Sequence, residues 1–168
     1  VPSMSDTASR LNLTHPETTM TTLLHLDASA RPGLAGLHVH GSHSRALSAR
    51  FVERWRHAAP GTRVLRRDVG QSPPAHVDHA WIEAAFTAPA DATDAMRARL
   101  AESDRLIDEL FAADVIVIGT ALYNFGMPST LKAWVDNIVR AGRTVDIDPS
   151  QADPYTPRLA EPARTAVI

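Results

Sequence analysis

A chain of 168 residues is long enough to bury one hydrophobic core and fits a single domain. Its net charge of −2 gives no general field that would gather nucleic acid or an anionic membrane, so neither is expected as a partner. It contains no cysteine, which excludes disulfides, thiolate metal sites and thiol redox chemistry. No apolar run approaches the roughly 20 residues that span a bilayer, and the default expectation is a cytoplasmic protein.

Residues 1–20 are polar and rich in Ser and Thr, and they show no periodicity. This composition predicts a disordered leader, and it places the folded domain over residues 21–168.

The first half of the domain alternates strand and helix patterns. Residues 21–27, TTLLHLD, predict a strand, and residues 44–59 predict a helix with Leu47, Phe51 and Trp55 at steps of four. Residues 63–69, RVLRRDV, predict a second strand, whose charges favour a position near the sheet edge.

In the second half, a short helix is expected around residues 81–86, followed by a longer one opened by Asp91 with Met96, Leu100, Ser103, Ile107 and Leu110 on its inner face. Residues 114–122, DVIVIGTAL, form a continuous apolar run, typical of a strand covered on both faces. A helix follows from Pro128 to Gly142, with Leu131, Trp134 and Ile138 inward, and residues 164–168 predict the first half of another strand.

This order predicts an α/β fold with a doubly wound parallel sheet and helices on both faces. Ligands of such folds bind at the carboxyl ends of the strands, where the connections change direction. Two loops, Ser29–Ser44 and Leu122–Met127, leave the first and third strands at that edge. We therefore expect them to be neighbours in space.

The first loop has the groups of an anion site. Ser29 lies just past the strand, and Ser42, His43 and Ser44 stand where the helix begins, so hydroxyls and unpaired amides meet the positive end of a helix dipole. The GxxxxGK[ST] pattern of nucleoside triphosphate sites is absent from the sequence. A single phosphate monoester is the better match, and the alternative is that Ser42 or Ser44 only caps the helix.

The second loop has the groups of a ring-binding wall. Tyr123 and Phe125 are two residues apart, so in an extended segment both rings project to one side with Asn124 between them. The alternative is that these rings fill a gap between strand and helix. Together the two loops favour a mononucleotide with a planar ring, and FMN fits that description.

Three segments carry a resemblance to a known family: LDASAR, SHSRALSARFVERW and ALYNFGMPSTLKAWVDNIVRAGRT. They resemble the FMN-dependent NADH-azoreductases, flavodoxin-like enzymes that also reduce quinones. The resemblance implies strand order 2-1-3-4-5, a homodimer, and ping-pong hydride transfer from NADH or NADPH through FMN to an azo compound or quinone. It places Ser29, Ser42, His43 and Ser44 at the phosphate, and Leu122, Tyr123, Asn124 and Phe125 at the isoalloxazine ring. No side chain is assigned to acid–base catalysis and no metal is implied.

The chain also departs from that family. The first loop is lengthened by PGLAGLHVHG, and Val145 and Ile147 stand where aromatic residues often cover the flavin. The sequence stops at the start of strand four, so the FMN-binding domain is expected to be cut short at its C-terminal end. Two alternatives remain open: an FMN-binding electron carrier that does not oxidise NADH, and a metal site at His38, His40 and His43.

Overall fold

The computed structural model describes residues 20–159 and 163–168, so the expected leader lies outside the described residues except for Met20. In chain order the elements are β1 (Thr22–Asp27), α2 (His43–Ala58), β2 (Arg63–Asp68), α3 (His79–Phe86), α4 (Asp94–Ala112), β3 (Val115–Gly119), α5 (Ser129–Ile138), β4 (Val145–Ile147), β5 (Tyr155–Pro157) and β6 (Thr165–Val167).

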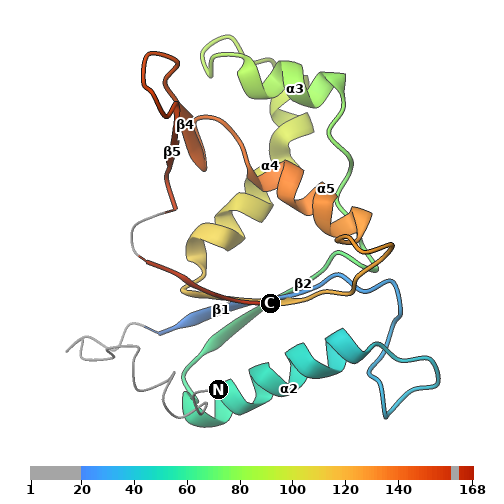
Figure 1. The fold of residues 1–168 in the computed structure, drawn as a ribbon. Coiled ribbons are helices and arrows are strands. Elements are labelled where there is room, and N and C mark those ends of the chain that lie inside the picture. Colours follow the sequence, from blue (N-terminus) through green and yellow to red (C-terminus); the bar gives the residue numbers. More distant parts are fainter. Residues whose placement is uncertain (1–19, 160–162) are drawn as a thin grey trace.

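The main sheet has the order β2-β1-β3-β6, and all three pairings are parallel. The strands β2, β1, β3 and β6 occupy the first four positions of the predicted order 2-1-3-4-5, which is thus confirmed that far. The predicted edge position of β2 is confirmed too. Helix α2 lies on one face of the sheet, and α4 and α5 lie on the other, as predicted for a doubly wound fold (Figure 1). Because every strand of the sheet runs the same way, the loops after β1 and β3 leave from one edge.

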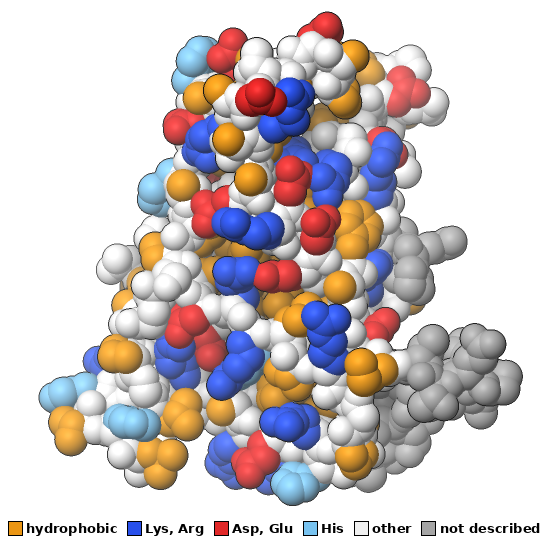
Figure 2. Space-filling view, turned by 180° about the vertical axis from the view of Figure 1, so that it is seen from behind, with side chains coloured by type: hydrophobic (Ala, Val, Ile, Leu, Met, Phe, Trp, Pro, Cys, Tyr) orange, Lys and Arg blue, Asp and Glu red, His pale blue; other side chains and the backbone are white. Residues whose placement is uncertain are grey.

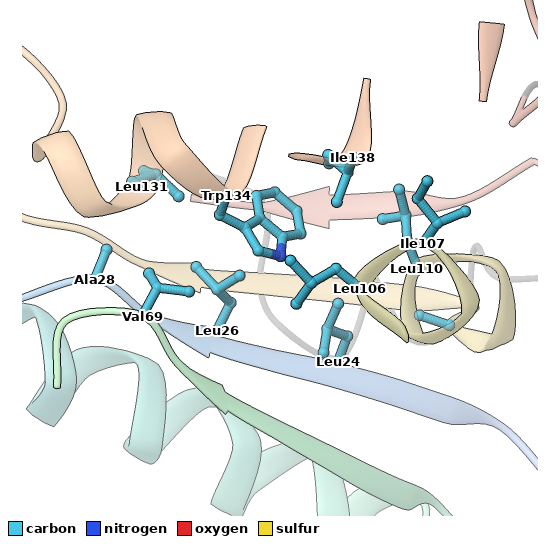
Figure 3. Close-up of a cluster of buried hydrophobic side chains, with 11 residues drawn as sticks. Leu24, Leu26, Ala28, Val69, Leu106, Ile107, Leu110, Leu131, Trp134 and Ile138 are labelled. Atoms are coloured by element: carbon cyan, nitrogen blue, oxygen red, sulfur yellow. The ribbon is translucent and has the colours of Figure 1, made fainter. Parts of the chain in front are cut away.

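The larger core lies between the sheet and helices α4 and α5 (Figure 3). Leu24 and Leu26 of β1 meet Leu106, Ile107 and Leu110 of α4, which recur at helical spacing and so share one face. Trp134, with Leu131 and Ile138 from the same face of α5, closes this layer. The inward positions predicted for α5 are thus confirmed.

The opposite face carries a smaller core and a polar region. Leu23, Val115 and Val117 pack under Val52 of α2. Leu47, predicted to face inward, is 67% exposed, because α2 is rotated so that Arg45, Ser48 and Val52 are its buried residues. Two polar side chains therefore face the sheet at the N-terminal end of this helix.

Several predicted boundaries were wrong. Helix α4 begins at Asp94 with Thr93 as its N-cap, not at Asp91, because the Thr93 hydroxyl accepts from the Met96 amide. Met96 and Leu100 are only partly buried. Pro128 is the N-cap of α5 and not its first helical residue, and α5 ends at Ile138, before Gly142.

The antiparallel hairpin β4–β5 was not predicted. No helix in the part of the chain that the structure describes is long and apolar enough to cross a membrane.

Candidate functional site

The two loops after β1 and β3 meet at the carboxyl edge of the sheet. The Ala30 amide donates to the Tyr123 hydroxyl at 2.9 Å, across 93 positions of the chain. Between the loops lies a cavity of about 380 Å³, of a size common for small-molecule sites. It is lined by Ser29, Arg31, Ser42, His43, Ser44, Leu47, Thr120, Ala121 and Tyr123. The predicted proximity of the two loops is confirmed.

The N-terminus of α2 opens onto this cavity. Ser42 is the N-cap, and its hydroxyl accepts from the Arg45 amide at 3.3 Å and lies 3.0 Å from the Ser44 hydroxyl. The amides of His43 and Ser44, in the first turn, have no carbonyl one turn earlier within the helix to bond. Ser42 can therefore cap the helix and still belong to an anion site, because the amides of His43 and Ser44 are left for a ligand.

The lengthened first loop holds Ser42 in place. The Ser42 amide donates to the Gly33 carbonyl at 3.1 Å, and the Ser42 carbonyl accepts from the Ala35 amide at 3.1 Å. Gly41 makes this closure feasible, because a Cβ there would lie 2.3 Å from the backbone of Leu34. The insertion thus forms a closed loop that leads into Ser42, which lines the cavity.

The histidines of this loop do not gather. His38 is engaged within the loop, where its Nδ1 accepts from the Leu34 amide at 3.0 Å. Across residues 20–159 and 163–168, no three His, Cys, Asp or Glu side chains converge as metal ligands would. The structure gives the alternative of a histidine metal site no support.

The second loop is a tight turn, and the predicted extended segment was wrong. Tyr123 and Gly126 exchange both backbone hydrogen bonds, at 2.9 and 3.0 Å. Asn124 and Phe125 occupy the two central positions with φ of 50° and 63°, the left-handed region typical of a type I′ turn. The Tyr123 and Phe125 rings therefore do not share one wall: Tyr123 reaches the cavity, whereas Phe125 is fully exposed.

Apolar side chains are concentrated on the surface of this turn. Leu122 is 76% exposed, Phe125 is fully exposed, and Met127 is more than half exposed. Among the predicted ring-binding residues, Leu122, Asn124 and Phe125 stand beside the cavity without lining it. Exposed apolar groups clustered beside a cavity mark a surface suited to a ligand or partner.

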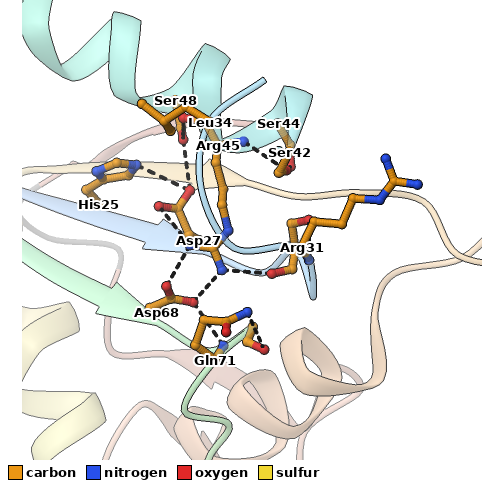
Figure 4. A network of polar contacts seen from close by, with 12 residues as sticks. His25, Asp27, Arg31, Leu34, Ser42, Ser44, Arg45, Ser48, Asp68 and Gln71 are labelled. Carbon is orange, nitrogen blue, oxygen red and sulfur yellow. Dashed lines mark hydrogen bonds and ion pairs between the residues drawn. The ribbon is translucent and has the colours of Figure 1, made fainter. Parts of the chain in front are cut away.

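A polar network, largely buried, lies near Ser42 and Ser44 (Figure 4). Arg45 is 6% exposed, and its two terminal nitrogens each lie 2.6 Å from an oxygen of Asp68 at the end of β2. The same guanidinium donates to the Ser29 carbonyl at 2.7 Å. One side chain therefore joins α2, β2 and the turn after β1.

The network extends to the end of β1. The Ser48 hydroxyl donates to Asp27 at 2.9 Å, and the second Asp27 oxygen lies 3.7 Å from Arg45. His25, almost wholly buried, lies 3.4 Å from Asp27. One neutral hydrogen bond, from Ser48, and the Arg45 cation thus face this carboxylate.

The pKa of Asp68 is lowered. Burial acts to raise it, but the hydrogen bonds from Arg45, the charge of Arg45 and the amides of Gln71 and Gly70 outweigh that effect. A carboxyl group whose pKa falls on folding stabilises the fold above its ordinary pKa of 3.8, and the contribution is lost as the pH drops through the lower folded value.

Asp68→Asn tests this linkage. At about pH 7 the variant should have a lower free energy of unfolding than the unmodified protein, and the difference should shrink as the pH falls from about 5 to about 3. Urea unfolding at several pH values measures it. A difference that stays constant over this range would show that Asp68 ionisation does not stabilise the fold.

Sequence reasoning missed Arg31, Leu47, Thr120 and Ala121 as lining residues, and it missed the Arg45 network entirely. A signal for the network was present. In TTLLHLD, Leu23, His25 and Asp27 lie on one face of the strand, and Leu24 and Leu26 lie on the other. The first face therefore changes from apolar to polar toward the end of the strand.

The donors around the cavity fit a phosphate monoester. Ser29, Ser42 and Ser44 bring hydroxyl groups, the first turn of α2 brings amides, and Arg31 brings a guanidinium group. The adjoining Tyr123 ring and the exposed apolar turn fit a planar ring better than a second charged group. These residues thus suit FMN at both of its ends.

Comparison with known proteins gives a consistent picture. A family model described as "Flavodoxin-like fold" matches residues 21–167. A protein of Idiomarina loihiensis named FMN-dependent NADH:quinone oxidoreductase 2 is 45% identical over 142 residues, which are 84% of this chain and 59% of that protein. A protein of Nostoc punctiforme named FMN-dependent NADH:quinone oxidoreductase is 45% identical over 129 residues, 77% of this chain and 60% of that protein.

Among solved structures, an azoreductase from Bacillus anthracis str. Sterne superposes with a TM-score of 0.68 at 27% identity, covering 82% of this chain and 62% of that one. The chain thus spans about three fifths of the length of the proteins that it matches.

Proposed function

Because the chain belongs to the family with the flavodoxin-like fold, we propose that it is an FMN-dependent oxidoreductase that passes hydride from NADH or NADPH to quinones and azo compounds. The observation that carries the proposal is the cavity between the two loops, which Ser29, Ser42, Ser44 and the start of α2 line and beside which the exposed apolar turn after β3 lies. The names of the relatives from Idiomarina loihiensis and Nostoc punctiforme and of the Bacillus anthracis structure support the same activity.

The residues divide between the two ends of the cofactor. Ser29, Ser42 and Ser44 bind the phosphate through their hydroxyls, and the amides of His43 and Ser44 receive its negative charge at the start of α2. Leu122, Tyr123, Asn124 and Phe125 hold the ring. When bound, FMN supplies the hydride chemistry, so the protein binds and orients and needs no acid or base of its own.

The backbone of the second turn has a further role toward the ring. Asn124 and Phe125 have left-handed backbones, and the turn is fastened by the paired Tyr123 and Gly126. Because the turn is held in this way, its polar groups have little freedom to reorient. Fixed polar groups of this kind stabilise negative charge that develops on the ring. The apolar side chains of the turn exclude water from the ring face when a substrate stacks there.

We propose that the protein acts as a homodimer in the cytoplasm, where NADH is supplied. An apolar groove of about 590 Å³ between α3, the end of α5 and β4–β5 supports a dimer. Phe86, Val139 and Tyr155 line it and are each more than half exposed. Sedimentation equilibrium tests the proposal, since a chain that stays monomeric at micromolar concentration contradicts it.

Stopped-flow mixing with NADH tests the activity. Rapid bleaching of bound flavin, followed by return of the colour on adding a quinone, is the expected result. Flavin that stays oxidised would instead identify an electron carrier. Carriers of that kind dock by a strongly acidic surface, whereas the described Lys and Arg side chains on the face in Figure 2 are interspersed with Asp and Glu.

The double variant Ser42→Ala with Ser44→Ala should weaken FMN binding at least about tenfold, because hydrogen bonds to a charged phosphate are lost. Fluorescence titration with FMN measures the change, and Ser150→Ala, an exposed serine beyond β4, is the control. Unaltered affinity in the double variant would leave both hydroxyls as helix caps only.

A further inference from the structure

The turn after β1 is fastened on its outer side by two side chains. The Ser29 carbonyl accepts from Arg45 at 2.7 Å, and the Ala30 carbonyl accepts from the Gln71 amide group at 3.0 Å. On the other side the Ala30 amide donates to Tyr123. Both carbonyls of the turn are therefore engaged by donors that do not line the cavity.

Arg45 is itself held rigidly. Its two bonds to Asp68 form a fork, a geometry that a guanidinium makes and an ammonium cannot. Asp68 in turn accepts a hydrogen bond from the backbone amide of Gln71 at 3.0 Å. The Asp68 carboxylate at the end of β2 thus holds both residues, whose side chains donate directly to the carbonyls of the turn.

This arrangement has an electrostatic consequence. A carbonyl oxygen that turned toward the phosphate would repel it, whereas a carbonyl bound by Arg45 or Gln71 cannot turn without losing a hydrogen bond. The turn therefore keeps the Ser29 hydroxyl on the cavity side, where it lines the site together with Ser42 and Ser44.

We infer that Arg45, held by Asp68, is a positioning residue that sets the phosphate half of the cavity and so makes the site select FMN over riboflavin, which lacks the phosphate. This inference rests on the proposed function. Its effect should be largest at the phosphate end, because Arg45 donates directly to the Ser29 carbonyl, whereas Tyr123 at the ring end is linked to the same turn through the Ala30 amide.

Arg45→Lys in the full-length protein tests the inference, with FMN and riboflavin as separate probes in fluorescence titrations. Lysine keeps the charge and loses the fork. We expect the FMN affinity to fall by about tenfold or more, the worth of a hydrogen bond to a charged group, while the riboflavin affinity changes by less than about twofold. The matched control is Arg67→Lys, which alters the bidentate pair between Arg67 of β2 and Glu109 of α4 and should change neither affinity.

Equal losses for both flavins would show a general loosening of the fold, and an unchanged FMN affinity would show that the turn does not need Arg45; either result overturns the inference. If Arg45→Lys does not fold, Asp68→Asn decides, because it weakens the fork that holds Arg45 and should lower the FMN affinity more than the riboflavin affinity; an unchanged ratio of the two affinities would overturn the inference. If the unmodified protein binds neither flavin, the proposed function itself fails.

Discussion

Gly70→Ala is expected to abolish tight FMN binding and to destabilise the fold by about 1–3 kcal/mol, the usual cost of overpacking. A Cβ at Gly70 would lie 2.2 Å from the Ser29 carbonyl oxygen and 2.9 Å from an Arg45 nitrogen. The backbone of the turn has to move to accept the methyl group, and the movement breaks the Arg45 hydrogen bond to Ser29. Flavin fluorescence titration and urea unfolding measure the two effects.

Gly61→Ala is the matched control. A Cβ at Gly61 meets nothing within 4 Å, and Gly61 has no positive φ, so the same added methyl should leave FMN binding and stability nearly unchanged. If Gly70→Ala bound FMN as tightly as Gly61→Ala, the close approach of Gly70 to Ser29 would have no bearing on the cofactor site.

Trp134→Ala should lower the free energy of unfolding by about 3–5 kcal/mol, because it leaves a large cavity in the main core. Trp134 is 4% exposed and packs between α5, α4 and the sheet. A loss of this size is a large part of the stability of an ordinary domain, roughly 5–15 kcal/mol. Denaturant unfolding monitored by circular dichroism gives the value.

Phe125→Ala is the comparison for this variant. Because the Phe125 ring is fully exposed, its removal should change the unfolding free energy by less than about 0.5 kcal/mol while it weakens flavin binding. Equal destabilisation by the two variants would contradict the packing described for Trp134 in Figure 3.

The sheet could be predicted because its signals are local and strong. The run from Val115 to Gly119 has no polar residue, and a strand of this kind needs cover on both faces, which fixes a parallel sheet with helices on either side. The hairpin β4–β5 was missed because its strands are only three residues long and largely exposed. Short exposed strands have no hydrophobic period to detect.

The site was predictable in place but not in detail. Topology alone brings the loops after β1 and β3 to one edge. The shape of the second loop depends on the backbone pairing of Tyr123 with Gly126, and Asn124-Phe125 is not one of the residue pairs that predict such a turn. Arg45 itself could not be recognised, although His25 and Asp27 mark the polar strand face beside it, because its partners Asp68 and Ser29 are distant in sequence and its position resembles any charged residue at the start of a helix.

We propose that one FMN molecule bridges the two loops, and an amide NMR titration can show this. FMN and inorganic phosphate should both shift the amides of His43 and Ser44, whereas FMN and riboflavin should both shift those of Asn124 and Phe125 and phosphate should not. FMN shifts confined to one loop, or centred on the groove between α3 and β4, would show that FMN does not bridge the loops.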